Sequence, residues 1–318
     1  MAKRAALKRA AKQETAAEGG INPKQPCPCG SGKRYKACHG INGGADAIVT
    51  RPFEGLAAEP ELIAMREFVP SATAKLPLKD SSAREITLAT VLPMAAAGLV
   101  RADGTAFVGL QVQTRSGDIS RDIARSIQWA LTAEPGAVLP IVGPDENSDG
   151  VRLQDLLVAD AQLEVTVHTD FAWWMPEDAE TTDEVNVSLE RANAAILPTA
   201  RLAGATAAYW VDARDRAHLR WVRPEQEEQL LGALAKLSVR NEIGLGEGTK
   251  YAGSFRAHGL LVPVWDLDPE LHAKEYEQPA ADLGKRLSAA LAEVAKDGLN
   301  EAEHRALGGL RGRQITLR

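Results

Sequence analysis

Hydrophobic residues recur along most of this chain with the periods of helices and strands. Isoleucine and leucine stand four residues apart from Ile119 to Leu131, which predicts an amphipathic helix from Asp118 to Ala133. The sequence Glu134-Pro135-Gly136 is typical of a helix end. Similar patterns predict three further helices, at about 183–196, 224–237 and 279–296.

Short β-rich runs separated by turn residues predict the strands. The turn at 102–105, Ala-Asp-Gly-Thr, lies between an apolar segment at 86–100 and a β-rich run at 106–113, which predicts a hairpin. A second hairpin is expected at 206–212 and 217–222. Two single strands are predicted later in the chain, at 163–171 and 259–265.

The order of these elements suggests an internal duplication. Residues 59–198 and 199–318 each read β-β-α-β-α, and the last strands of the two halves continue into similar sequences at 171–176 and 264–269. The alternative is a coincidence of a common order. Either interpretation predicts an α+β fold, with mixed sheets that carry helices on one face.

The first 58 residues differ from this body. By composition, residues 1–20 are a basic flexible tail, residues 21–40 hold every cysteine, and residues 41–58 are predicted to be a linker. Residues 1–40 contain nine Lys and Arg against two Glu, a net charge of +7, so residues 41–318 carry −13. A basic arm on an acidic body is attracted to polyanions through the arm alone, although a solubilising tail has the same composition.

Composition places the chain among soluble globular proteins. Its 45% hydrophobic and 25% charged residues are ordinary values for that class. No apolar run reaches the roughly 18 residues of a membrane span. The basic N-terminal residues lack the apolar core of a secretory signal. We therefore expect a cytoplasmic protein.

The three cysteines carry the clearest chemistry. Cys27, Cys29 and Cys38 have the spacing C-x-C-x8-C, and His39 follows at once. Three thiolates and one imidazole make a closed tetrahedral set suited to a structural Zn²⁺, whereas a catalytic zinc would need a vacant position. A disulfide fits poorly because one thiol stays unpaired, and a redox site would need Cys-x-x-Cys. Three incidental cysteines are the remaining alternative.

The surrounding residues agree with a metal site. A segment this short, with Ile21 and Tyr35 as its main apolar residues, cannot bury enough surface to fold alone, so we expect it to be unfolded without metal. Gly-Ser-Gly-Lys at 30–33 is not a phosphate loop, since Arg34 stands where a hydroxyl residue is required.

Residues 26–40, Pro-Cys-Pro-Cys-Gly-Ser-Gly-Lys-Arg-Tyr-Lys-Ala-Cys-His-Gly, resemble the SEC-C motif, the zinc knuckle at the C-terminal tail of the SecA translocation ATPase. The resemblance implies that Cys27, Cys29, Cys38 and His39 bind Zn²⁺. In that family the knuckle is a binding module that contacts the SecB chaperone or, in related proteins, the ribosome. No ATPase motor follows it here. The whole chain is similar to SEC-C-containing proteins of unknown function from high-GC bacteria.

Candidate sites in the body are weaker. Trp173, Trp174, Trp210, Trp221 and Trp265 stand at strand ends and hairpins, where they either seal a core or line a groove. The glycine-rich stretch 244–253 carries one lysine and could wrap a phosphate, but it matches no dinucleotide fingerprint, so a flexible connection from helix to strand is predicted.

Two groups of titratable residues follow strands. Asp266, Asp268, Glu270 and His272 could form a metal or acid/base site, or simply a polar strand end. His168 and Asp170 share one strand face and could pair as a base and its orienting group. No nucleophile motif accompanies them. His218, His258 and His304 are expected to be surface or structural residues.

We therefore predict a zinc-binding cytoplasmic adaptor. Its knuckle docks to a large partner, a ribosome or an export or translation chaperone, and the contacts come from Lys33, Arg34, Tyr35 and Lys36. The first alternative is an enzyme in residues 60–318 that uses the knuckle for targeting. The second is direct RNA binding through the basic arm, residues 1–12.

Overall fold

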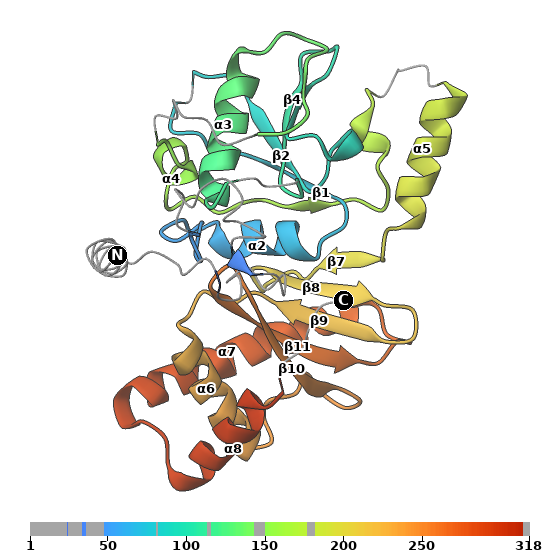
Figure 1. Ribbon diagram of the computed structural model, residues 1–318. Helices are drawn as coiled ribbons and strands as arrows, with labels where there is room; N and C mark the ends of the chain where they lie inside the picture. Colours follow the sequence, from blue (N-terminus) through green and yellow to red (C-terminus); the bar gives the residue numbers. More distant parts are fainter. Residues whose placement is uncertain are drawn as a thin grey trace, which may run out of the picture.

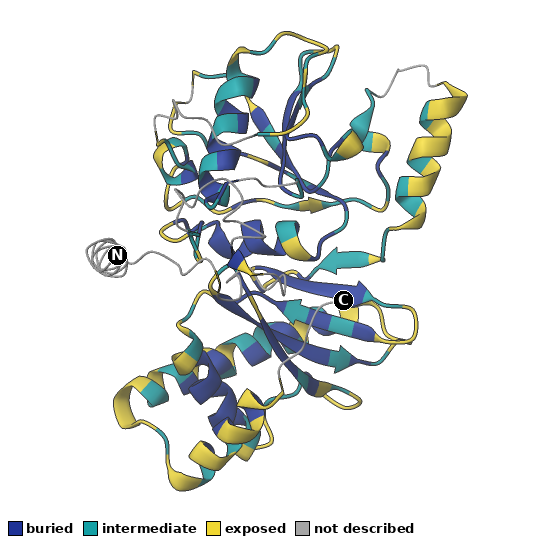
Figure 2. Cartoon of the chain, in the orientation of Figure 1, coloured by how far each residue is buried: buried dark blue, intermediate teal, exposed yellow. Residues whose placement is uncertain are grey.

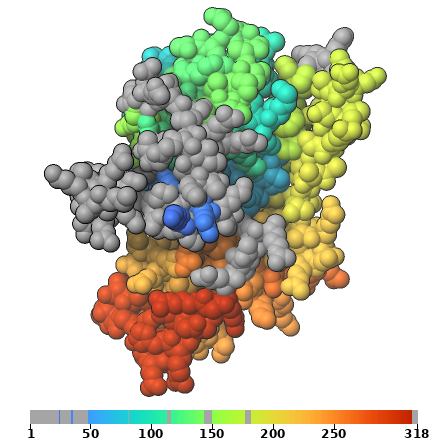
Figure 3. Space-filling model, viewed as in Figure 1, coloured from blue at the N-terminus to red at the C-terminus, as the bar shows by residue number. Residues whose placement is uncertain are grey.

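The computed structural model has two halves stacked end to end (Figures 1 and 3). In Figure 3 the green surface of α3 lies at one pole of the molecule and the red surface of α7 and α8 at the other. The structure describes residues 24, 34–35, 48–80, 82–112, 116–142, 150–176 and 182–313.

The first half is built on a mixed six-stranded sheet in the order β5-β3-β4-β2-β1-β6. Strands β2 and β4 run parallel, and the other neighbours are antiparallel. The predicted hairpin is confirmed, because β3 and β4 pair across the turn at 102–105. The strands are β1 (Ala72–Lys75), β2 (Ile86–Ala89), β3 (Gly98–Val100), β4 (Ala106–Gly109), β5 (Val138–Leu139) and β6 (Thr166–Val167).

Helix α3 (Ile119–Thr132) covers one face of this sheet, as its period predicted. The Asp118 carboxylate caps it by accepting a hydrogen bond from the Ser120 amide, and Ile123, Ile127 and Ala130 form its buried side. The half also holds shorter or more exposed segments: η3 (Pro93–Ala95), α4 (Leu153–Leu156), η4 (Ala172–Trp174) and α5 (Asp183–Ala194). Figure 2 shows α5 largely exposed, and none of its residues is buried.

The second half is an antiparallel five-stranded sheet in the order β10-β11-β9-β8-β7. The hairpin predicted at 206–212 and 217–222 is confirmed as β8 and β9. Three helices pack on one face around a core that includes Trp265, Leu234 and Leu287. These elements are β7 (Thr199–Arg201), β8 (Ala208–Asp212), β9 (Ala217–Trp221), α6 (Glu227–Val239), β10 (Lys250–Ala257), β11 (Leu260–Leu267), α7 (Ala273–Asp297) and α8 (Glu301–Arg311).

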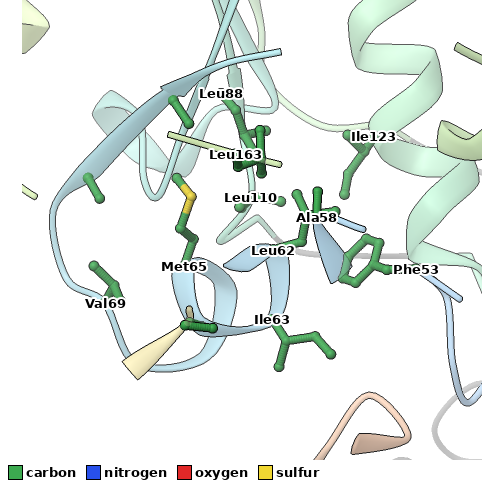
Figure 4. Close-up of a cluster of buried hydrophobic side chains, with 14 of the residues drawn as sticks. Phe53, Ala58, Leu62, Ile63, Met65, Val69, Leu88, Leu110, Ile123 and Leu163 are labelled. Atoms are coloured by element: carbon green, nitrogen blue, oxygen red, sulfur yellow. The ribbon is translucent and has the colours of Figure 1, made fainter. Parts of the chain in front are cut away.

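Helix α2 (Glu59–Glu67) lies between the two sheets and is buried on all sides over its first seven residues. Figure 4 shows Leu62 and Met65 pointing toward Leu88 and Leu163 of the first half, while Ile63 points away from them. On the second half, the Phe68 ring that follows α2 packs edge-on against Tyr209 and Phe255. One hydrophobic core therefore joins both sheets through α2.

The structure corrects four boundaries. Residues 51–58, expected in the linker, belong to the body, since Phe53, Leu56 and Ala58 are buried in its core. The glycine-rich loop ends at Thr249, because Lys250–Ala257 pairs with β11 as strand β10. The strand predicted at 163–171 is regular only at Thr166–Val167.

Helix α7 also begins six residues before the predicted start at 279. Pro279 lies inside this helix, where its missing N–H removes one hydrogen bond. The buried side chains of Tyr276, Ala280 and Leu283 on both sides of the proline hold the helix against the core.

The mixed α+β fold is confirmed, but the duplication is not. The first half has a helix before its first strand and a parallel pair, whereas the second half is antiparallel throughout. A hairpin, β10–β11, occupies the place where one strand was predicted. Within the described part of the chain, no helix combines the length and the apolar character that a membrane crossing requires.

We predict that Gly259→Ala destabilises the protein by about 1–3 kcal/mol. Gly259 has a φ of +86°, and a Cβ there would lie 2.9 Å from the Cβ of Arg51, so the turn between β10 and β11 could not keep its contact with the segment before α2. Gly308→Ala is the control, because a Cβ on this exposed helical glycine meets nothing within 4 Å. Urea unfolding of both variants measures the difference, and equal midpoints would contradict the prediction.

Candidate functional site

The predicted zinc ligands Cys27, Cys29, Cys38 and His39 lie outside the described residues, as do Lys33 and Lys36. The fit of the metal therefore rests on donor chemistry, and three thiolates with one imidazole are donors that Zn²⁺ prefers. Among the described residues, no group of three or more His, Cys, Asp or Glu side chains could hold a metal ion.

Two predicted contact residues of the knuckle are described. Arg34 is exposed, whereas the Tyr35 side chain is only 4% exposed. The guanidinium is therefore available to a partner. The tyrosine ring is turned away from solvent, and its contact role stays a prediction.

His168 and Asp170 do not form a base and orienter pair. The His168 Nε2 lies 2.8 Å from the hydroxyl oxygen of Thr73 on β1, and the Asp170 carboxylate accepts a hydrogen bond from the Ala172 amide. Burial lowers the pKa of His168, although the charge of Asp170 partly opposes this effect. The carboxylate thus stabilises the turn that leads into η4.

The acidic residues at 266–272 are also separated. The Asp266 carboxylate lies 3.1 Å from the Nδ1 of His218, its cross-strand neighbour on β9. The Asp268 carboxylate accepts from the Glu270 amide in a local turn. His272 lies beside the Trp210 ring at the start of α7. These groups therefore do not converge on one point, and the enzyme hypothesis loses the arrangement that would have supported it.

The tryptophans divide between the halves. Trp210, Trp221 and Trp265 are at most 5% exposed and belong to the core of the second half. Trp173 and Trp174 lie on the outer face of the first sheet, where their indole N–H groups donate to the Ser71 hydroxyl and the Val91 carbonyl. These hydrogen bonds hold η4 against the first half. Because the tryptophans lie in two different halves, the five residues do not line a common groove.

A buried ion network on α2 could not be predicted from the sequence. The fully buried Glu61 carboxylate accepts hydrogen bonds from the Arg201 guanidinium (2.9 Å), the Ala207 amide (2.9 Å) and the Tyr209 hydroxyl (2.5 Å). Burial and the neighbouring carboxylate raise the pKa of Tyr209 well above its usual value. The partners are more than 100 residues from Glu61, and no local pattern links them.

A second buried carboxyl group lies in the first half. Asp122 on α3 is 3% exposed, and neither of its oxygens has a hydrogen-bond partner within the described part of the chain. Burial raises its pKa to about 6, and the nearby Arg125 and Arg66 oppose this shift only in part. The group therefore titrates close to neutral pH.

A hollow of about 870 Å³ lies next to α2, between the start of this helix, the end of β9 and α7. Its three charged lining residues are each paired. Glu59 binds Arg51, Arg223 binds Glu225 and Lys285 binds Asp282. The first two pairs are partly buried, whereas the Lys285 pair lies on the surface, so the charged groups around the hollow already have partners within the protein.

Comparisons with known proteins agree with these observations. A model of the DUF5926 family, a family of unknown function, matches residues 52–318. The chain belongs to this family. A model of the SEC-C motif matches residues 24–41, which confirms the resemblance found in the sequence. No curated protein and no solved structure matches the chain significantly.

We predict that Glu61→Gln destabilises the protein by about 3–5 kcal/mol, because a neutral amide replaces a fully buried carboxylate whose three donors, the half-buried Arg201 guanidinium among them, are arranged around a negative charge. Tyr209→Phe, which removes one hydrogen bond, costs about 1–2 kcal/mol. Urea unfolding followed by circular dichroism measures both. Glu54→Gln is the control, since this exposed carboxylate makes only a surface ion pair with Arg51. A loss in Glu61→Gln no larger than in the control would contradict the role of the network.

We predict that Asp122→Asn makes stability less dependent on pH. The folded pKa of Asp122, about 6, exceeds its usual unfolded value of 3.8, so the folded state binds the proton more tightly. The stabilisation from this group is complete below pH about 4 and is lost as the pH rises through about 6.

The variant should therefore gain stability over the parent between pH 4 and pH 8, by at most about 3 kcal/mol. Thermal unfolding across that range provides the measurement. Asp160→Asn, at an exposed position, is the matched control, and parallel curves for all three proteins would contradict the prediction.

Proposed function

We propose that this protein is a zinc-dependent adaptor whose SEC-C knuckle docks it to a large assembly, with the ribosome as the first candidate and an export or translation chaperone as the second. The SEC-C match at residues 24–41, together with its Cys₃His donor set, is the observation that carries the proposal. Bound Zn²⁺ would neutralise most of the thiolate charge and hold this short segment in one conformation.

The construction of the body supports a separate docking module. Among the described residues, both large cores are formed by side chains from Phe53 onward. Loss of zinc should therefore unfold the knuckle and leave the body folded. Such a division lets a variant in the knuckle test docking without a change in the rest of the protein.

Charge supports a ribosomal partner over a neutral one. Residues 1–40 carry +7, and the exposed Arg34 lies among them. An arm of this charge is attracted to ribosomal RNA, whereas the acidic remainder, at −13, is repelled. The knuckle would then supply orientation and the arm would supply electrostatic attraction.

Direct RNA binding through residues 1–12 is the second candidate, favoured by the same charge. The two differ in their dependence on metal. Docking by the knuckle requires folded Cys₃His, while binding by the arm alone survives loss of zinc and weakens steeply with salt.

We predict that the full chain co-sediments with ribosomes at low and moderate salt, and that Cys38→Ser reduces the bound fraction about tenfold or more. Elemental analysis should find one zinc ion per parent chain and less in the variant. Ser31→Ala, inside the knuckle but without a predicted ligand, is the matched control. Equal pelleting of parent and Cys38→Ser would favour the arm alone, and absence of both from the pellet would exclude the ribosome as partner.

A further inference from the structure

Arg220 is a half-buried cation without a counter-charge among the described residues. It lies on β9, where its side chain shares a face of the sheet with Val222, which packs into the core around α2, whereas Leu219 and Trp221 face the helices. The guanidinium carbon is 5.7 Å from the centre of the Phe68 ring. Burial lowers the pKa of Arg220, and no described carboxylate opposes this effect. The group is still charged at neutral pH, so its burial is unfavourable until an anion reaches it.

Other arginines of the second half show the usual arrangement. Arg201 binds the Glu61 carboxylate at 2.8 Å, and the Arg223 Nε donates to Glu225 at 3.0 Å. Arg220 has no such hydrogen bond or ion pair within the described part of the chain, and an aromatic ring offers no oxygen acceptor. Its five N–H donors therefore remain available, in the planar fork that binds phosphate or carboxylate through two hydrogen bonds.

Two further basic side chains rise from the same end of this face. His218 precedes Arg220 by two residues, so both lie on one side of β9. The Nδ1 of His218 lies 3.1 Å from the Asp266 carboxylate on β11, and the exposed Lys250 stands directly opposite Asp266 on β10. The three strands are neighbours (Figure 1) and lie about 4.8 Å apart, so the basic residues start from a patch about 10 Å across.

Asp266 does not neutralise this patch. It lies beside His218 and 4.0 Å from the largely exposed Arg216. Burial lowers the pKa of His218, which is therefore neutral at pH 7. Arg216, Arg220 and Lys250 then carry three positive charges against one carboxylate, a net +2, on a body whose total is −13. Such a patch attracts a compact anion, while its acidic surroundings repel a long polyanion.

We propose that Arg220, His218 and Lys250 bind the phosphate group of a small molecule at the open end of the second sheet. Arg220 holds two phosphate oxygens through its fork, and Lys250 donates to the third. Asp266 orients the His218 ring, whose Nε2 shares a proton with the phosphate. Three separate basic groups match the three terminal oxygens of a phosphate better than the two of a carboxylate.

Thermal unfolding and calorimetry on the full chain test the site. Inorganic phosphate and glycerol phosphate should each raise the unfolding midpoint above that in chloride of equal ionic strength, since the folded state alone binds them. Arg220→Gln should weaken phosphate binding about tenfold or more. Arg256→Gln is the matched control, because it removes the same charge from the opposite face, where Arg256 pairs with Glu227 of α6. No rise in the parent, or equal affinities in the parent and Arg220→Gln, would overturn the proposal.

Stability in chloride separates binding from a structural role. Because Arg220 lacks a counter-charge, Arg220→Gln should unfold at the temperature of the parent or above it. A variant that is less stable in chloride, yet responds to phosphate as the parent does, would make Arg220 structural and overturn the proposal. Arg220→Lys, which keeps the charge without the fork, should retain part of the affinity.

An RNA oligonucleotide provides the last comparison. Binding of RNA that is tighter than that of glycerol phosphate and is lost in Arg220→Gln would assign the face to nucleic acid and overturn a small ligand. The knuckle takes no part in this site, so failure of these tests leaves zinc and ribosome binding untouched.

Discussion

The buried carboxylate of Glu61 is the interaction on which the arrangement of this protein depends. It lies on a helix enclosed by two sheets, and every donor it accepts from belongs to the second half. A charge in such a place is stable only when its partners surround it, so its burial requires the second sheet to sit in one position against α2. Hydrophobic contacts around Phe68 supply attraction, while the carboxylate supplies orientation.

The enclosure of α2 by both sheets explains why the protein is a single body despite its two sheets. The core of the first half continues through α2 into residues of β8, β10 and β11, so neither half would keep its buried surface alone. The segment before α2 makes a second set of contacts with the second half. Arg51 binds Glu59 through two hydrogen bonds and packs against the turn at Gly259, which ties the start of the body to the tip of the β10–β11 hairpin.

The segment that carries the proposed function precedes the part of the chain that joins the two sheets around α2. The SEC-C segment precedes the first core residue, and the family model of the body begins at residue 52. In the proposed function, metal coordination would stabilise the small docking module, whereas burial stabilises the larger body that presents it. The titratable groups considered as catalytic candidates are instead used locally, as turn caps and cross-strand pairs.

The sequence by itself determined the features that depend on near neighbours. The period of four around Ile123, the Asp-Gly turn at 103–104 and the Cys₃His spacing each predicted an element or a motif, because caps, turns and ligand spacing are local. Only the tertiary structure decided how α2 is enclosed, how the strands are ordered and where Glu61 finds Arg201 and Tyr209. Those contacts join residues far apart in the chain, and a charged glutamate in a helix carries no local sign that it will be buried.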